Sequence, residues 1–484
     1  MAAARGPRDG AGLAAEVRDF AAVRGEFGLP VEYPAGALGE AERTVAQPLD
    51  VGTRRDAADL PLVTVDPAGS KDLDQAVLVR RRARGYRVFY AIADVAAFVP
   101  PSGALDAEVR RRGQSLYLPD GTVPLHPTVL SEGAASLLPE QVRPAVLWTI
   151  DLDQQGALVR FDLRRALVRS IAALDYGSVR RSWEVGASHP SVELLAEVGR
   201  LRREQAVQRG AIELGLPEQQ VDSDGAGGWR PTLRPRLEVE AYNAEISLLT
   251  GMCAAEVMLG AGVGILRTVP DPEPATVASL RRSARRLGVA WPEDVTPAAA
   301  LAGMDPARPE ALVVHVAATR LLRGAGYTAF EGGSPARPRH AGLGAAYAHV
   351  TAPLRRLADR YATEVCLAVA EGREVPGWAL EGLPQLPSAM GSSDRLASQV
   401  ERACLAQAQA WAMRDRLGEE FPATVLRAGS DGEGEVFVAD PPVIARCSAG
   451  EPGTGEQLDE GSRVRVRLVE ADPVRREVGF AVVE

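Results

Sequence analysis

The hydrophobic pattern of the chain changes twice, and these changes constrain its fold more than any other feature. From Leu62 bulky residues alternate with polar ones in short runs, which is the pattern of half-buried β-strands. After Tyr176 apolar residues recur at helical spacing, and from about Phe421 short alternating runs return. Strands, then helices, then strands again indicate an α+β protein rather than a regular βαβ repeat.

The first strand-rich region predicts a mixed sheet with helices around it. A turn at Arg84-Gly85 joins two of its runs into a hairpin. A helix is expected at Ala104–Arg112, followed by an irregular, proline-rich stretch to Pro139. The strands are expected at Leu62–Asp66, Ala76–Arg82, Tyr86–Val95, Ala145–Asp153 and Ala157–Val168.

The middle region predicts long helices separated by loops rich in Gly, Pro and Ser. Residues 223–236 and 376–393 are expected to be two of these loops. The helices are expected at Val192–Gln208, Glu238–Leu259, Ala311–Arg323, Thr351–Glu371 and Asp394–Arg416.

The two ends of the chain predict smaller units. Residues 421–484 contain five short strand patterns broken by Gly and Pro, which suggests a small OB-type barrel. Residues 1–55 contain helix candidates at Leu13–Glu26 and Leu38–Val45. This segment is either a compact winged-helix-like unit that contacts nucleic acid or a helical packing arm, and the sequence favours neither.

Composition limits the classes of protein to consider. With 484 residues, of which 46% are hydrophobic and 25% charged, the chain can form a large core and two or three domains. A net charge of −9 excludes a uniformly basic coat, so a polyanion would have to be held by local arginines or by metal.

No pattern points to a membrane, a disulfide framework or a zinc site. The N-terminus lacks the apolar core of a signal peptide, so a cytoplasmic protein without a membrane partner is expected. The chain is also expected to be a monomer. The cysteines and histidines have no ligand spacing and are expected to be structural. They are Cys253, Cys366, Cys404 and Cys447, with His126, His189, His315, His340 and His349.

Three aspartates lie close together after the first predicted strand. Asp66 ends that strand, and Asp72 and Asp74 follow a turn that contains Gly69. If the chain is extended there, Asp72 and Asp74 point the same way, and the turn can bring Asp66 beside them. Clustered carboxylates repel unless hard cations neutralise them, and Mg²⁺ or Mn²⁺ prefers oxygen ligands. The alternative is a solvated loop or a helix cap.

Four ordered blocks of sequence resemble the ribonuclease II (RNB) family, and together they extend over most of residues 56–420. A pair at Glu401-Arg402 falls where the family has an acid and an arginine. The other blocks read TVDPAGSKDLDQA from Thr64, YAIADVAAFVPPSG and onward from Tyr90 to Pro139, and HAGLGAAYAHVTAPLRRLADRY from His340.

The resemblance implies an RNB catalytic domain over residues 56–420, followed by an S1-type RNA-binding barrel over residues 421–484. It implies processive hydrolysis of single-stranded RNA from the 3′ end, with Mg²⁺ as cofactor and release of nucleoside 5′-monophosphates. Two metal ions about 3.5–4 Å apart could activate water and stabilise the leaving 3′ oxygen.

Carried over by position, the resemblance implies metal ligation by Asp66, Asp72 and Asp74, with Asp74 essential. Gln75 stands where the family has a fourth aspartate. Because an amide oxygen is a poorer ligand for a hard cation than a carboxylate, one metal position is expected to be weak.

The resemblance also implies residues that hold RNA. Tyr117 and Tyr176 match aromatics that contact bases, where stacking contributes about 1–3 kcal/mol per base. The family's partner aromatic, expected near residues 210–220, has no counterpart here. Glu245 is a candidate for sugar recognition. Glu401 is expected to act near the 3′ end, and the alternative is a buried ion pair with Arg402 or another arginine.

Arg355 and Arg356 follow Thr351 and Pro353, which are expected to cap a helix and occupy its first turn. A phosphate would then bind at the helix N-terminus, with Arg355 as its main partner and Arg356 as a second. The structural alternative is a salt bridge between Arg355 and Asp359, four residues later.

The N-terminal segment departs from the family. Its 55 residues cannot hold the two cold-shock barrels that ribonuclease II proteins commonly carry. In this it resembles shortened bacterial relatives, in which a small helical unit replaces those barrels. A more open path, admitting structured RNA with a 3′ overhang, is one hypothesis. Two other functions stay open. The first is a catalytically weakened RNB-like protein that only binds RNA, which Gln75 favours. The second is a phosphodiesterase that acts on DNA.

Overall fold

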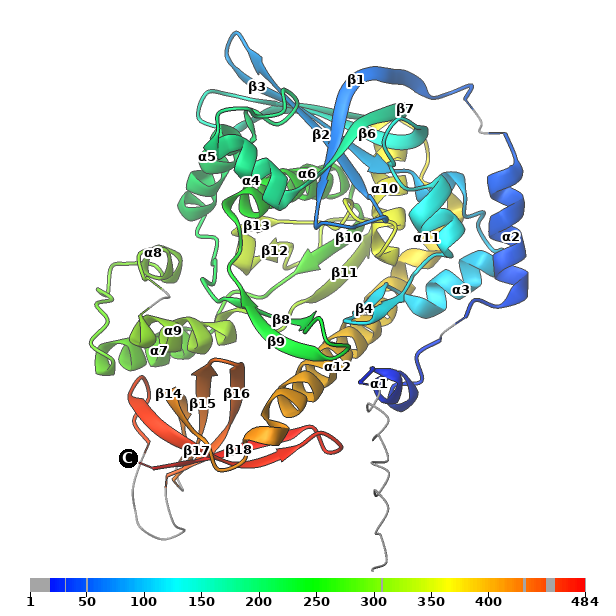
Figure 1. Ribbon diagram of the computed structural model, residues 1–484. Coiled ribbons are helices and arrows are strands. Elements are labelled where there is room, and N and C mark those ends of the chain that lie inside the picture. The colour runs from blue at the N-terminus through cyan, green and yellow to red at the C-terminus, as the bar shows by residue number, and fades with distance from the viewer. Residues whose placement is uncertain are drawn as a thin grey trace, which may run out of the picture.

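The computed structural model describes residues 18–483, apart from 31, 49–50, 306–307, 430–431 and 450–457. It contains two closed five-stranded β-barrels, one near each end of the chain, with a helical region between them (Figure 1). The predicted α+β class is confirmed. The predicted mixed sheet closes into a barrel.

The first barrel holds the predicted aspartates at one rim. Neighbouring strands are antiparallel, except that β1 and β7 pair in parallel and close the barrel. Asp66 ends β1 and lies beside Asp175 at the end of β7, while Asp74 directly precedes β2. The strands are β1 (Arg55–Asp66), β2 (Gln75–Arg82), β3 (Gly85–Ala93), β6 (Val142–Leu152) and β7 (Leu158–Asp175).

Helices cover this barrel and complete its core. The long helix α6 (Glu238–Ala261) is apolar enough to cross a membrane by length and composition, but half of its most apolar window is buried inside the protein. It packs as a core helix, close to its predicted limits. Its neighbours are α4 (Tyr176–Glu184), α5 (Leu195–Gln208) and α10 (Leu357–Ala370).

The helix predicted from Thr351 begins six residues later, at Leu357. Thr351 therefore does not cap it, and Pro353 is not in its first turn. Because proline disfavours helical geometry in the residue before it, the segment begins as a turn, in which Arg355 N–H donates to the Ala352 carbonyl at 3.2 Å. Its backbone groups then bond to side chains and to a neighbouring strand instead of to a helix.

Both predicted loops turned out to contain regular structure. Residues 376–393 form α11 (Gly377–Gly382) and the first part of α12 (Leu386–Met413), because Leu383, Leu386 and Met390 are buried. Residues 223–236 contribute the end of β8 (Glu218–Ser223) and all of β9 (Trp229–Arg234), which form a hairpin. The Gly and Pro residues there mark turns within structure.

A three-helix unit lies between β10 (Val263–Thr268) and β11 (Gly326–Glu331) and has its own apolar core. Its last helix ends at Ala318, where a short 3₁₀ turn to Leu322 follows, so only part of the predicted Ala311–Arg323 helix is α-helical. Its helices are α7 (Pro274–Arg286), α8 (Pro297–Ala302) and α9 (Pro309–Ala318).

The described part of the N-terminal segment contains α1 (Ala21–Glu26) and α2 (Ala35–Ala46). Phe20 and Val23 pack against Val400 and Trp411 of α12, and Arg24 pairs with Asp120. This contact with α12 is the packing-arm arrangement. Residues 13–17 of the predicted first helix lie outside the described residues.

The second barrel has a core separate from the first. It is closed by antiparallel pairs and by parallel pairing of β16 with β18, as the predicted OB-type barrel requires. Ala410 and Met413 of α12 enter its core, so α12 links the two halves of the molecule (Figure 1). The strands are β14 (Glu420–Ala428), β15 (Glu433–Ala439), β16 (Pro442–Ser448), β17 (Arg463–Asp472) and β18 (Glu477–Val482).

Candidate active site

Asp74 is the most deeply buried of the predicted acids, with 2% of its surface exposed. Its Oδ1 accepts a hydrogen bond from the backbone N–H of Leu354 at 2.7 Å. Its Oδ2 lies 3.3 Å from Nε of Arg355. The rim of the first barrel and the arginine segment therefore meet at this carboxylate.

The site is short of positive charge. Burial raises the pKa of Asp74 to about 8 and that of Asp66 to about 6, although the charge of Arg355 opposes both shifts. The negative charge of Asp72 adds to both increases. Oδ2 of Asp66 is buried and has no hydrogen-bond partner. An additional cation would relieve this deficit.

A divalent cation fits the chemistry of these donors, although the carboxylates are not gathered around one point. Within the described ranges, no three His, Cys, Asp or Glu side chains are grouped as a metal site. Asp72 instead accepts a hydrogen bond from the Tyr117 hydroxyl at 2.8 Å, and Asp74 faces Arg355. Three carboxylates with one orphaned oxygen suit Mg²⁺ or Mn²⁺ once those two partners move aside.

Gln75 does not join the carboxylates as the predicted fourth ligand. Its Nε2 donates to the carbonyl of Thr351, and its Oε1 accepts from the hydroxyl of Tyr90 at 3.2 Å. Both ends of the amide are therefore engaged by the protein. Ligation of a cation by Gln75 stays a prediction.

The segment Thr351–Arg356, which we call the arginine loop, is held by contacts from several elements. Ala352 N–H donates to Asp359 Oδ1 at 2.7 Å, and the Pro353 carbonyl lies 3.1 Å from Nε2 of His126. Ser115 N–H donates to the Arg355 carbonyl at 3.0 Å. With the bonds from Asp74 and Gln75, most backbone polar groups of the loop have fixed partners, which preorganises it.

The two arginines of the loop have different environments. Arg355 keeps 50% of its side chain exposed beside Asp74. Arg356 binds Asp359 through Nε and Nη2, at 2.6 and 3.0 Å, and Asp359 is fully buried. The predicted structural ion pair with Asp359 thus exists, but its arginine is Arg356, and binding of RNA by Arg356 stays a prediction.

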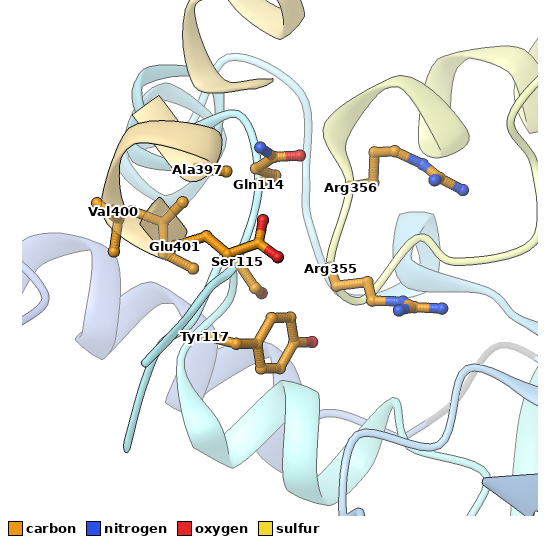
Figure 2. Close-up of a pocket in the computed structure, with 9 residues that line it drawn as sticks. Gln114, Ser115, Tyr117, Arg355, Arg356, Ala397, Val400 and Glu401 are labelled. Carbon is orange, nitrogen blue, oxygen red and sulfur yellow. The ribbon is translucent and has the colours of Figure 1, made fainter. Parts of the chain in front are cut away.

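A cavity of about 420 Å³ opens between the arginine loop, β4 (Leu116–Leu118) and α12. Figure 2 shows the Tyr117 ring and the Glu401 carboxylate directed into the space that faces Arg355. Tyr117 is 51% exposed, so its ring can receive a planar group. The cavity is lined by Gln114, Ser115, Leu116, Tyr117, Arg355, Arg356, Ala397, Val400 and Glu401.

Glu401 is brought to this cavity from α12, far along the chain from the other residues. Both Glu401 and Arg402 are exposed, so the alternative of a buried ion pair between them is wrong. A carboxylate on the wall opposite Arg355 can accept hydrogen bonds from hydroxyl groups of a bound molecule.

Tyr176 and Glu245 lie outside this cavity. Tyr176 begins α4, is partly buried against the core and lies near Asp66. Glu245 faces α5, where the charges of Arg202 and Arg209 counteract the rise that burial causes in its pKa. A contact between Glu245 and the sugar stays a prediction.

Sequence patterns missed several residues that shape the site. Gln114 reaches the cavity wall and donates to the Ser393 carbonyl on α12 at 2.9 Å. His126 is buried, and burial lowers its pKa to about 4, so it supports the loop as a neutral ring. The three-residue spacing of Arg356 and Asp359 was the one available local signal.

Sequence comparison gives the family. The pattern of the RNB domain matches residues 54–370. The chain belongs to the RNB family. The pattern of the RNase II-type exonuclease C-terminal S1 domain matches residues 419–483. The RNB match contains the aspartates and the arginine loop, whereas Glu401 lies between the two matches.

Two curated relatives of this RNB chain are longer than it is. Ribonuclease R of Escherichia coli is 27% identical over 475 residues, covering 89% of this chain and 57% of that protein. Ribonuclease R of Chlamydia muridarum is 27% identical over 430 residues, covering 85% and 59%. The chain thus spans less than three fifths of these two relatives.

Solved structures show how widely this RNB fold is shared. RNase R of Mycoplasma genitalium, in complex with ribose methylated single-stranded RNA, has a TM-score of 0.85 at 20% identity, covering 96% of this chain and 77% of that one. Its complex with double-stranded RNA has a TM-score of 0.82 at 21% identity, covering 96% and 82%. The structure of yeast Ssd1, a pseudonuclease, has a TM-score of 0.70 at 16% identity, covering 86% of this chain and 53% of that one. Chemistry must therefore be argued from the site.

Proposed function

We propose that this chain is an exoribonuclease that uses a divalent metal to hydrolyse RNA from its 3′ end and releases nucleoside 5′-monophosphates. One observation carries the proposal. The buried Asp74 contacts Arg355 at the edge of a cavity of about 420 Å³ that also holds an exposed tyrosine and a carboxylate. Its relatives named ribonuclease R and the RNB match support the same activity.

The aspartates are the proposed holders of the metal, with Mg²⁺ as the expected ion and Mn²⁺ as a substitute. Asp66 offers a buried oxygen without a partner, and Asp72 and Asp74 offer carboxylates that now face Tyr117 and Arg355. When bound, such an ion polarises the phosphodiester and lowers the pKa of water, so that hydroxide forms near neutral pH.

Arg355 is the proposed phosphate ligand. Its guanidinium is half exposed, its backbone is fixed by Ser115 and by the Asp74–Leu354 bond, and it already neutralises a carboxylate. A scissile phosphate can take that charge through a forked pair of hydrogen bonds. Arg355 would then shift from Asp74 to the phosphate as the metal enters.

Tyr117 and Glu401 are the proposed contacts to the terminal nucleoside. The exposed Tyr117 ring offers a stacking surface that tolerates any base, which suits an enzyme that advances along RNA. The Glu401 carboxylate can only accept hydrogen bonds, and ribose hydroxyls donate them. Tyr176 stays a weaker candidate because its ring is partly buried near Asp66.

A catalytically weakened RNA-binding protein is the second candidate. The position of Gln75, away from the acids, and the likeness to a pseudonuclease favour it. The same channel would then bind RNA but leave it intact. Asp66, Asp72 and Asp74 argue for the enzyme, because a protein that only binds RNA has no need of three carboxylates beside a phosphate.

The decisive experiment is a time course on 5′-labelled poly(A) with Mg²⁺, with EDTA, and with Asp74→Asn. The wild type should shorten the RNA stepwise and release monophosphates, while EDTA and the variant should abolish both. Asp162→Asn is the matched control, because Asp162 is half exposed on β7 and pairs with Arg164 of the same strand. Full activity in Asp74→Asn would reject the site, and RNA binding without cleavage by the wild type would favour the second candidate.

Two further substrates define the proposed partner. A DNA oligonucleotide of the same sequence should be cut more slowly, because it lacks the 2′-hydroxyl that Glu401 could bind. A duplex with a 3′ overhang tests for structured RNA, as the double-stranded RNA complex of the Mycoplasma protein suggests. Products that stop before the duplex would restrict the enzyme to single strands.

A further inference from the structure

Gln75 belongs to a chain of hydrogen bonds that runs from α6 to the arginine loop. Ser247 Oγ lies 2.6 Å from the Tyr90 hydroxyl, which donates to Gln75 Oε1 at 3.2 Å. Gln75 Nε2 donates to the Thr351 carbonyl. Three elements of the catalytic domain are therefore tied to the start of the loop through one amide.

The chain of bonds has a fixed direction. Burial raises the pKa of Tyr90 well above its ordinary value, so the phenol stays protonated. Its O–H donates a hydrogen bond to Gln75 Oε1. Ser247 then donates to Tyr90. Because the Thr351 carbonyl can only accept, the side chain at position 75 must donate. An amide meets that requirement, whereas a carboxylate would place an unpaired negative charge against the carbonyl.

Gln75 acts beside Asp74, and the two residues hold the loop at different points. Asp74 accepts from the Leu354 N–H, and Gln75 donates to the Thr351 carbonyl. Arg355 follows directly after Leu354. The start of β2 thus fixes the backbone on which the proposed phosphate ligand is carried.

We propose that Gln75 is a positioning residue that holds the arginine loop for Arg355 and is not a ligand of the catalytic cation. This inference rests on the proposed function only in treating Arg355 as the phosphate ligand. On this proposal, the residue at position 75 positions the loop in this chain, where the family has an acid. Ligation of the cation is then left to Asp66, Asp72 and Asp74.

The two possible roles of Gln75 predict that one substitution changes different quantities. If Gln75 were a cation ligand, Gln75→Glu would supply a better oxygen donor and tighten metal binding. If it positions the loop, the same substitution removes the donor to Thr351 and weakens RNA binding. Gln75→Glu preserves the shape of the side chain, so the roles are distinguished by whether metal affinity or RNA affinity changes.

The experiment measures RNA and metal binding separately. Fluorescence anisotropy of a labelled poly(A) oligonucleotide in EDTA reports RNA affinity without turnover, and Mn²⁺ titration followed by electron paramagnetic resonance reports metal affinity. Gln75→Glu should weaken RNA binding about tenfold, the effect of leaving a carbonyl unpaired, with Mn²⁺ affinity changed by less than about twofold. Gln154→Glu, at an exposed turn residue, is the matched control and should change neither.

A double-mutant cycle tests whether Gln75 acts through Arg355. In the Arg355→Ala background, Gln75→Glu should have little further effect on RNA affinity, because the side chain that it positions is gone. Tyr90→Phe, which removes only the hydroxyl that orients the amide, should weaken RNA binding about threefold. It also tests the proposal independently if Gln75→Glu does not fold.

Tighter Mn²⁺ binding by Gln75→Glu with unchanged RNA affinity would overturn the proposal, and so would fully additive effects in the cycle. These results do not depend on cleavage. A wild type that binds poly(A) without cutting it would reject the proposed function and leave the role of Gln75 measurable. A wild type that cuts normally while Gln75→Glu and Tyr90→Phe behave like the control would reject the role of Gln75 alone.

Discussion

The two barrels of the chain have the same number of strands but use charge in different ways. At the rim of the first, Asp74 is 2% exposed and Asp359, which anchors the arginine loop there, is fully buried. On the second, Arg465 and Arg467 keep 62% and 50% of their side chains exposed and share one partner, Glu420. One barrel fixes charges in a single geometry, and the other displays them on a surface.

This difference follows from the cost of burying charge. A buried ion keeps its position only if hydrogen bonds and a partner compensate its lost hydration, so its neighbours become part of its geometry. An exposed pair exchanges its partner for water at little cost. Changes at the first barrel should therefore alter stability or chemistry strongly, whereas changes at the second should adjust RNA affinity.

The largest effect is expected for Arg356→Ala. It would leave Asp359 charged and buried without its bidentate partner, and breaking such a pair typically costs about 3–5 kcal/mol of unfolding free energy. Urea denaturation followed by circular dichroism measures this loss. Arg180→Ala, which removes an exposed pair with Glu184, should cost less than about 1 kcal/mol. Equal losses in the two variants would contradict the contrast between buried and displayed charge.

Arg355→Ala should spare the fold and damage the chemistry. Half of its side chain is exposed, so its removal leaves the core intact, but the developing charge on the phosphate loses its donor. Removing such a donor typically lowers kcat by about 10²–10³-fold. Single-turnover degradation of poly(A), with melting temperature measured in parallel, separates the two effects. An inactive variant that is also unfolded would mean that Arg355 is structural.

The overall fold could be predicted from the sequence because hydrophobic periodicity is local. The hairpin at Arg84-Gly85 and the helix at Ala104–Arg112 agree with the structure, since alternation and helical spacing each bury one face. The two predicted loops were wrong because glycine and proline were taken as breaks. Pro387 sits in the first turn of α12, where its missing N–H costs nothing.

The candidate site was only partly predictable, since its geometry depends on contacts between distant segments. The residue types at Asp74, Arg355 and Glu401 were visible, and the cavity brings Arg355 and Glu401 together. No local pattern could show that Arg356, rather than Arg355, pairs with Asp359, or that Gln75 bonds to Thr351 across 276 positions of sequence. Such partners are set by how the barrel rim meets the arginine loop.

A change of pH should show the charge deficit of the first barrel. The folded-state pKa of Asp74, about 8, lies above its ordinary value of 3.8, so its contribution to stability is complete below that value and is lost as pH rises toward 8. In EDTA, the melting temperature of the wild type should fall relative to Asp74→Asn between pH 4 and pH 8.

Adding Mg²⁺ at pH 8 should reverse that fall in the wild type, because the ion binds the folded carboxylates, and should have little effect on Asp74→Asn. Differential scanning fluorimetry of the wild type and of Asp74→Asn, each in EDTA and in Mg²⁺, provides the measurement. Parallel pH curves for the two proteins in EDTA would show that Asp74 does not carry the charge deficit.

The smallest effect is expected on the second barrel, where Glu420 forms ion pairs with two arginines. Glu420→Ala should free Arg465 and Arg467 without disturbing the core, because all three side chains lie at the surface. If both arginines then reach phosphates, the salt dependence of poly(A) binding should steepen by about 1.4 in log–log slope, and the gain in affinity should be largest at low salt. Glu374→Ala removes the same charge from an exposed site outside this barrel, so it corrects for net charge. An equal gain in both variants would mean that the second barrel attracts RNA only through overall charge, and a steeper slope in Glu420→Ala alone would assign the contact to this strand face.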